Sequence, residues 1–94
     1  MFVDDFIWLP AIVDKLAVKH HVAPDEVEEV FFNRPKYRFV EKGERPGEDL
    51  YAATGRTDAG RYLVVFYIFK LHRTALILSA RDMDKKERKR YERK

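Results

Sequence analysis

A chain of 94 residues suits a single domain, and because so short a chain buries only somewhat more than ~60% of its unfolded surface on folding, a second core is excluded. Hydrophobic residues (46%) and charged residues (37%) together exclude wholesale disorder, and the lack of cysteine excludes disulfides, thiolate zinc sites and thiol nucleophiles. The formal net charge of +3 is too small to argue for a nucleic-acid partner by itself.

Two amphipathic helices are predicted in the amino-terminal third. Proline is tolerated in a helix's first turn, so the first helix should run from Pro10 to about His20. Its buried stripe is expected to comprise Ile12, Val13, Leu16 and Ala17. The second helix should cover Pro24 to Phe32, because acidic residues in its first turn suit the positive end of a helix and Pro35 opposes its continuation. Its expected buried residues are Val27, Val30 and Phe31.

Four strands are predicted next, at Lys36–Glu41, Leu50–Arg56, Tyr62–Phe69 and Thr74–Ser79. Every connection between them is short, which favours an antiparallel sheet. The third strand is apolar on both faces, which indicates a central position in that sheet.

The last helix is predicted from Lys85 to about Arg93, because Asp84 and Glu87 have the spacing of a capping box. The basic charge is concentrated here: the last ten residues hold seven Lys or Arg against two Glu, whereas the first 84 hold 12 basic and 14 acidic residues. Such a run is usually a solvated helix face, but it also suits a nucleic-acid backbone. The predicted phosphate-binding residues of this helix are Lys85, Lys86, Arg88, Lys89 and Arg90.

These elements predict an α+β fold over residues 1–94, in which two helices precede a four-stranded antiparallel sheet and a third helix follows it. The longest apolar run, Tyr62–Phe69, is too short to span a membrane, and Asp4 and Asp5 stand where a secretory signal would carry lysines. We therefore expect a cytoplasmic protein without a membrane partner.

Three segments of the chain resemble the BrnT family, the toxins of a class of bacterial type II toxin–antitoxin pairs. They are FIWLPAIVDKLAVKHHVAPDEVEEVF near the amino terminus, ATGRTDAGRYLVVFY in the middle and LILSARDMDKKERKRYE near the carboxyl end. The chain departs from the family at His21, where the family usually has a glycine that ends the first helix in a left-handed turn. The resemblance implies a fold similar to that of the RelE ribonucleases.

The resemblance also implies an activity: cleavage of RNA without a metal ion, with the 2′-hydroxyl as nucleophile. That reaction needs a base, an acid and cations around the developing charge. The candidate catalytic residues are Arg81, His20, Lys19, Tyr91 and Glu87, and Arg56 and Arg61 beside the hairpin turn are further candidates for binding nucleic acid. The three histidines lack a metal-binding signature, so neither a metal nor another cofactor is expected.

Each candidate also has a purely structural interpretation. Arg81 is equally well explained by an ion pair with Glu87, and Glu87 fits helix capping better than general-base catalysis. Arg56 and Arg61 fit solvated side chains. Lys19 and His20 would stabilise the negative end of the first helix, and Tyr91 would anchor the last helix on the sheet or stack on a base.

The function predicted from the sequence is therefore that of a toxin-like endoribonuclease. Its partners would be RNA and an antitoxin like those named BrnA, which carry a ribbon-helix-helix DNA-binding part, and a homodimer and a toxin–antitoxin heterotetramer are both compatible with that function. The antitoxin is expected to cover the basic corner, which we define as Arg81 together with the basic residues of the last helix. It is also expected to dock on exposed apolar residues of the third strand or first helix. The alternatives are a non-catalytic module that binds nucleic acid, or a protein-interaction module, each using the same basic patch.

Overall fold

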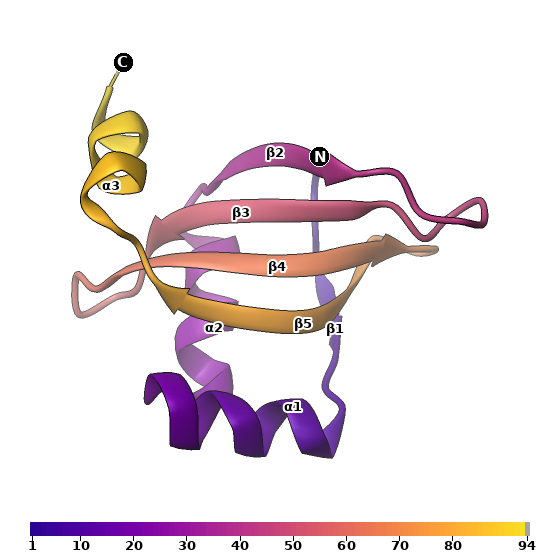
Figure 1. Cartoon of the computed structure of the whole chain (residues 1–94), viewed down its shortest axis with the longest axis horizontal. Coiled ribbons are helices and arrows are strands. Elements are labelled where there is room, and N and C mark those ends of the chain that lie inside the picture. The colour runs from indigo at the N-terminus through magenta and orange to yellow at the C-terminus, as the bar shows by residue number, and fades with distance from the viewer. Residues whose placement is uncertain (94) are drawn as a thin grey trace.

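The computed structural model of the chain describes residues 1–93. Its elements in order are β1 (Asp5–Ile7), α1 (Pro10–Lys15), the π-helical segment η1 (Leu16–His20), α2 (Pro24–Phe32), β2 (Lys36–Glu41), β3 (Leu50–Arg56), β4 (Tyr62–Lys70), β5 (Thr74–Asp82) and α3 (Lys85–Glu92) (Figure 1). The predicted α+β class is confirmed, and α2, β2 and β3 have the predicted bounds. The first predicted helix corresponds to α1 followed directly by η1.

The sheet has five strands in the order β1-β5-β4-β3-β2. The four predicted strands pair antiparallel as expected, but the predicted number of strands is wrong. The additional strand β1 pairs parallel to β5, with Phe6 opposite Ala75, and makes the sheet mixed. Three residues are too few for an alternating pattern, and the partner strand lies about 70 residues further along the chain, so no local signal marks β1. The central position predicted for β4 is confirmed.

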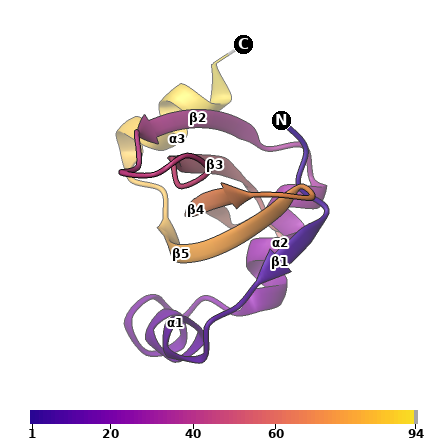
Figure 2. The ribbon, with the colours of Figure 1, turned by 90° about the vertical axis from the view of Figure 1, so that its right-hand side faces the viewer.

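The helices lie on both faces of the sheet. The helices α1 and α2 cover one face, which we call the helix face, and α3 lies at one end of the opposite face, which we call the α3 face (Figure 2). The core is formed between the helix face and the two amino-terminal helices, where Leu16, Val27, Val30, Tyr67 and Ile77 are fully buried. The rings of Phe31 and Tyr67 form a T-shaped pair with 5.1 Å between their centroids. Because both helices dock on the same face, the α3 face is left for other contacts.

Some predicted burial and boundaries need correction. Ala17 is exposed, because the wider turn of η1 rotates it away from the stripe that buries Leu16. The predicted burial of Val27, Val30 and Phe31 is confirmed. Strand β5 continues to Asp82 rather than ending at Ser79, so Arg81 belongs to the strand itself.

A β-bulge in β5 decides which face Arg81 occupies. Ile77 pairs with Tyr67 and Ser79 with Phe66, which leaves Leu78 without a partner in β4. Side chains alternate between faces along a regular strand, so Arg81 would share the helix face with Ile77 if the strand were regular. The extra residue reverses the alternation, and Arg81 lies on the α3 face opposite Val64.

No helix formed by residues 1–93 is both long and apolar enough to cross a membrane.

Candidate functional site

The end of the sheet beneath α3 brings together cations from strands that are distant in sequence. Lys36, Thr54, Val64 and Arg81 form one row across β2, β3, β4 and β5, and Arg38, Ala52, Phe66 and Ser79 form the next. Both rows lie on the α3 face, because side chains two residues apart share a face. Three positively charged side chains, Lys36, Arg38 and Arg81, therefore share this face near the strand ends.

Arg81 is held by Glu87 of α3. Its two terminal nitrogens donate hydrogen bonds to the two carboxylate oxygens of Glu87, at 2.7 and 2.9 Å, in the bidentate geometry of a strong ion pair. Hydrogen bonding to Arg81 lowers the pKa of Glu87, and the same contact raises the pKa of Arg81. The same carboxylate accepts the backbone N–H of Asp84, whose side chain accepts the N–H of Glu87. The predicted capping box is confirmed, and it fixes the carboxylate that orients Arg81.

The rest of α3 docks through a few polar and aromatic contacts, and it buries no residue. The Lys36 ammonium donates to the backbone carbonyls of Tyr91 and of Arg93, the latter at 2.8 Å, which satisfies carbonyls at the negative end of the helix. The ring of Tyr91 forms a T-shaped pair with Tyr62 of β4, with 5.9 Å between the ring centroids. The predicted role of Tyr91 as the aromatic anchor of this helix is thus observed.

Arg38 is the residue of this face that sequence reasoning missed. It is exposed, it lines a hollow between β2 and α3 together with Glu87 and Tyr91, and its charge contributes to lowering the pKa of Glu87. The available signal was that Arg38 alternates with Tyr37 and Phe39 and so faces away from the core. Its proximity to α3 depends on strand order, which the sequence pattern does not report.

Arg61 occupies a separate cluster on the helix face. Its guanidinium pairs with Asp82 at 2.7 Å and with Glu26 of α2 at 3.2 Å. It also donates to the backbone carbonyls of His20 and His21, at 2.9 and 2.8 Å. The side chain is only 26% exposed, so the solvated state expected from sequence is wrong. Arg61 joins the end of η1, the start of α2 and the end of β5, and its charge is matched by two carboxylates.

The structure divides the predicted catalytic residues into two groups. Arg81, Glu87 and Tyr91 lie together on the α3 face. His20 and Lys19 end η1 on the helix side, where the His20 carbonyl is bound by Arg61 and the His20 side chain is close enough to contribute to the lowered pKa of Asp82. Lys19 is exposed, and both residues lie on the opposite side of the sheet from Arg81, Glu87 and Tyr91.

The predicted nucleic-acid-binding residues other than Arg61 lie on α3 or beside it. Lys85, Lys86, Arg88, Lys89 and Arg90 are all exposed. Arg56 at the end of β3 is also exposed, and its guanidinium lies 4.9 Å from the centroid of the Tyr62 ring. These positions are compatible with the predicted basic corner.

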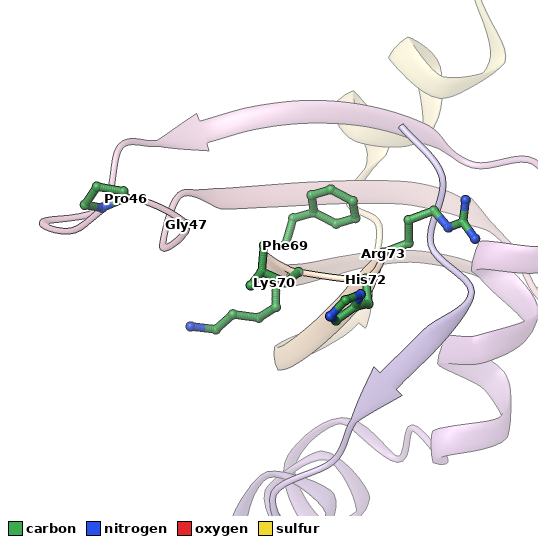
Figure 3. A pocket seen from close by; sticks show the side chains of 7 residues that line it. Pro46, Gly47, Phe69, Lys70, His72 and Arg73 are labelled. Carbon is green, nitrogen blue, oxygen red and sulfur yellow. The ribbon is translucent and has the colours of Figure 1, made fainter.

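The opposite end of the sheet has a wide, open hollow that contains none of the predicted site residues (Figure 3). It lies between the β2–β3 loop and the β4–β5 turn, and its lining includes Phe69, Lys70 and His72. His72 and Arg73 in this turn both have positive φ, of 60° and 55°. Arg73 is paired with Asp4 at 3.1 Å. Within residues 1–93, no group of three His, Asp or Glu side chains is gathered as a metal site would require.

Comparison with known proteins gives one family match. A family model described as "Ribonuclease toxin, BrnT, of type II toxin-antitoxin system" matches residues 8–87. A search of curated proteins found no match. The matched range includes α1, α2, all of β2–β5 and the part of α3 that carries Glu87.

Proposed function

This chain belongs to the BrnT family of ribonuclease toxins of type II toxin–antitoxin systems, and we propose that it cleaves RNA without a metal ion, by attack of the 2′-hydroxyl on the adjacent phosphate. Membership of this family makes the chain a ribonuclease toxin, and it implies an RNA substrate and a protein antitoxin. The resemblance seen in the sequence is confirmed by the family match. The mechanism, the residues and the identity of the antitoxin are the parts that we propose.

The observation that carries the proposal is the convergence of Arg81 and Arg38 on the exposed α3 face. A phosphodiester that passes through a pentacoordinate state gains negative charge on its equatorial oxygens, and fixed cations stabilise that charge. The bidentate contact with Glu87 orients the Arg81 guanidinium before substrate arrives, so little reorganisation is needed. We assign phosphate binding and charge stabilisation to Arg81 and Arg38, and orientation of Arg81 to Glu87.

The side chains that could transfer protons during cleavage are Glu87, Tyr91, His20 and Lys19. Glu87 has a lowered pKa and is therefore a weak base, and Tyr91 is a second candidate for proton transfer on this face. His20 and Lys19 lie on the helix side, so they serve the same phosphate only if the substrate bends around the end of the sheet. Cleavage rates of the His20→Ala and Tyr91→Phe variants separate these assignments, because loss of a proton-transfer group should lower the rate.

The antitoxin that we propose is a BrnA-like protein with a ribbon-helix-helix part, which covers Arg38 and the basic corner. A negatively charged segment of such a protein would occupy the cations that otherwise hold RNA. Co-expression of this chain with a candidate antitoxin tests the assignment: growth should recover, and α3 in the purified complex should be protected from hydrogen exchange.

The test of the enzymatic proposal is RNA cleavage by the purified protein in the presence of a chelator. We expect products with a 2′,3′-cyclic phosphate, no cleavage of RNA that lacks the 2′-hydroxyl, and loss of cleavage in Arg81→Ala. Arg73→Ala is a matched control, because Arg73 is also an arginine paired with a carboxylate but lies in the β4–β5 turn at the opposite end of the sheet. A wild-type protein that forms no cyclic-phosphate product would contradict the proposal.

One observation favours a second candidate, a module that binds nucleic acid without cleaving it. The two charged groups that meet on the α3 face, Arg81 and Glu87, satisfy each other, and the lowered pKa of Glu87 leaves it a poor base at neutral pH. Retained RNA binding together with absent cleavage, in wild type and in Arg81→Ala alike, would select this alternative.

A further inference from the structure

The aromatic ring of Tyr62, at the start of β4, lies beneath guanidinium groups from two different elements. The guanidinium carbon of Arg88 in α3 is 4.0 Å from the centroid of the Tyr62 ring, and that of Arg56 in β3 is 4.9 Å away. The rings of Tyr91 and Tyr62 form a T-shaped pair, and the Tyr62 hydroxyl donates to Glu92 at 3.3 Å. Arg88 and Tyr91 explain how α3 is anchored, whereas Arg56 belongs to β3.

Arg56 also differs from its neighbours in charge balance. Arg61, Arg81 and Arg88 each pair with a carboxylate, whereas within residues 1–93 the guanidinium of Arg56 has no ion-pair partner. Its side chain is exposed. An arginine that lies against an aromatic ring and keeps its charge unmatched can offer the outer face of its guanidinium plane to another flat group.

The surrounding surface leaves room for such a group. Two open hollows meet at Arg56: one is lined also by Tyr62, Met83 and Arg88, and the other by Asn33, Asp58 and Tyr91 among others. Gly60 lines both, and a Cβ atom at Gly60 would come within 3.1 Å of the Arg56 guanidinium. Glycine at this position, with φ of 93°, therefore both makes the turn and leaves the guanidinium uncrowded.

We propose that Arg56, backed by Tyr62, is a stacking subsite for one unpaired nucleobase, which makes single-stranded RNA the substrate class of this site. The proposal rests on the RNA-binding part of the proposed function. A base in a duplex has both faces covered by its neighbours, whereas an unpaired base stacks on aromatic and guanidinium planes. Arg81 and Arg56 lie on the same face of the sheet, so a strand that stacks here directs its backbone towards the proposed phosphate site.

The experiment measures binding without cleavage. The probe is a fluorescently labelled 2′-fluoro RNA of about 12 nucleotides, which spans a typical single-strand site and carries no 2′-hydroxyl nucleophile. Affinity is measured by anisotropy for the single strand and for the same strand in a duplex, at several salt concentrations. We expect wild type to prefer the single strand by about tenfold or more, in line with the contribution of one stacked base.

Two arginine variants separate stacking from charge. In Arg56→Lys the positive charge remains but the flat guanidinium is lost, so single-strand affinity should fall about fivefold or more while the salt dependence stays unchanged. In Arg56→Ala the affinity should fall further, and the slope of log K against log salt should become less steep by about 0.7. If Arg56→Lys binds like wild type, or if duplex binds as tightly as single strand, the stacking subsite is refuted.

Tyr62 variants supply a second readout. Tyr62→Phe keeps the ring and should keep single-strand affinity, whereas Tyr62→Leu should lower it with no change in salt slope. Circular dichroism checks whether Tyr62→Leu loosens α3. If it does, the Arg56 variants still test stacking, because within residues 1–93 no hydrogen bond or ion pair joins the Arg56 side chain to that helix. Equal losses in Tyr62→Phe and Tyr62→Leu would count against stacking. Failure of RNA cleavage leaves this binding result intact, so the two proposals fail separately.

Discussion

Arg81 and Asp82 are adjacent in β5, yet their side chains form ion pairs on opposite faces of the sheet. Arg81 pairs with Glu87 on the α3 face, and Asp82 pairs with Arg61 on the helix face. The end of β5 is thereby attached to α3 on one side and to the η1–α2 turn on the other. The two pairs have different consequences: the Arg61 cluster stabilises the fold, and the Arg81 pair orients a cation on an exposed surface.

Substitution Arg61→Met should destabilise the protein by about 2 kcal/mol, measured by urea unfolding. The change removes two ion pairs and two hydrogen bonds to backbone carbonyls, and hydrogen bonds to charged groups contribute about 1.5–3 kcal/mol each when well shielded. The effect is moderated because Asp82 is 63% exposed. The control is Arg73→Met, whose exposed pair with Asp4 should contribute less than about 1 kcal/mol. Equal losses in the two variants would contradict a special role for Arg61.

Acid should destabilise the protein through Asp82 and Glu87. Hydrogen bonds from Arg61 and Arg81 lower the pKa values of these carboxyl groups below their ordinary values of 3.8 and 4.5. A carboxyl group with a lowered pKa in the folded state contributes stability above its unfolded pKa, and loses it as the pH falls through the folded pKa. The free energy of unfolding should therefore decline below about pH 5. In Glu87→Gln the protein should be less stable at neutral pH, and its decline in acid should be shallower; an unchanged slope would exclude the linkage.

Substitution Arg38→Ala should lower the rate of RNA cleavage by about 10- to 100-fold with little effect on stability, because it removes one proposed donor to the phosphate. Arg45→Ala is the matched control: it removes the same charge from the loop between β2 and β3 and should leave the rate unchanged. Initial rates on a labelled RNA, with circular dichroism to confirm folding, give the comparison. Equal rates for Arg38→Ala and wild type would remove Arg38 from the site.

Substitution Lys36→Met should loosen α3 without unfolding the sheet. Lys36 is the side chain that binds backbone carbonyls at the end of this helix, and α3 buries no residue that would compensate. Hydrogen exchange should show faster exchange of the α3 amides, with β4 amides unaffected. Lys70→Met, at the far end of the sheet, provides a control in which α3 exchange should stay at the wild-type rate.

Substitution His21→Gly should stabilise the protein or leave its stability unchanged, within about 1 kcal/mol. His21 has a φ of 54°, a left-handed conformation that costs a non-glycine residue roughly 1–2 kcal/mol. Glycine relieves this strain but adds flexibility to the unfolded chain. His21→Val should be clearly destabilising, because a β-branched side chain tolerates positive φ poorly. Thermal unfolding of both variants and of wild type ranks their stabilities. A His21→Val variant more stable than wild type would contradict the strain assigned to His21.

Local patterns in the sequence predicted much of the fold. Residues next to one another decide where α2, β2 and β3 begin and end, and the capping box of α3 depends only on Asp84 and Glu87. The left-handed turn at His21 forms without a glycine, and Arg61 binds the carbonyls of His20 and His21 there. The family resemblance likewise depends on short segments, and the family match confirms it.

Other features had no local signal. Strand β1 exists because β5 offers it a parallel partner, and Arg61 becomes a link between three elements only after α2 and β5 have been brought together. The candidate site shows the same division: the sequence singled out Arg81 and Glu87, whereas Arg38 entered only through strand order.

By itself, the sequence determined the order and type of most elements, the concentration of positive charge near the carboxyl end and the identity of the family. The tertiary structure alone decided which face Arg81 and Asp82 occupy. The physical reason is the unpaired Leu78: a single extra residue in β5 reverses the side-chain alternation that a regular strand would impose. Arg81 therefore meets α3 and Asp82 meets Arg61, and a cation that regular alternation would turn towards the helix face lies on the surface where we propose that RNA binds.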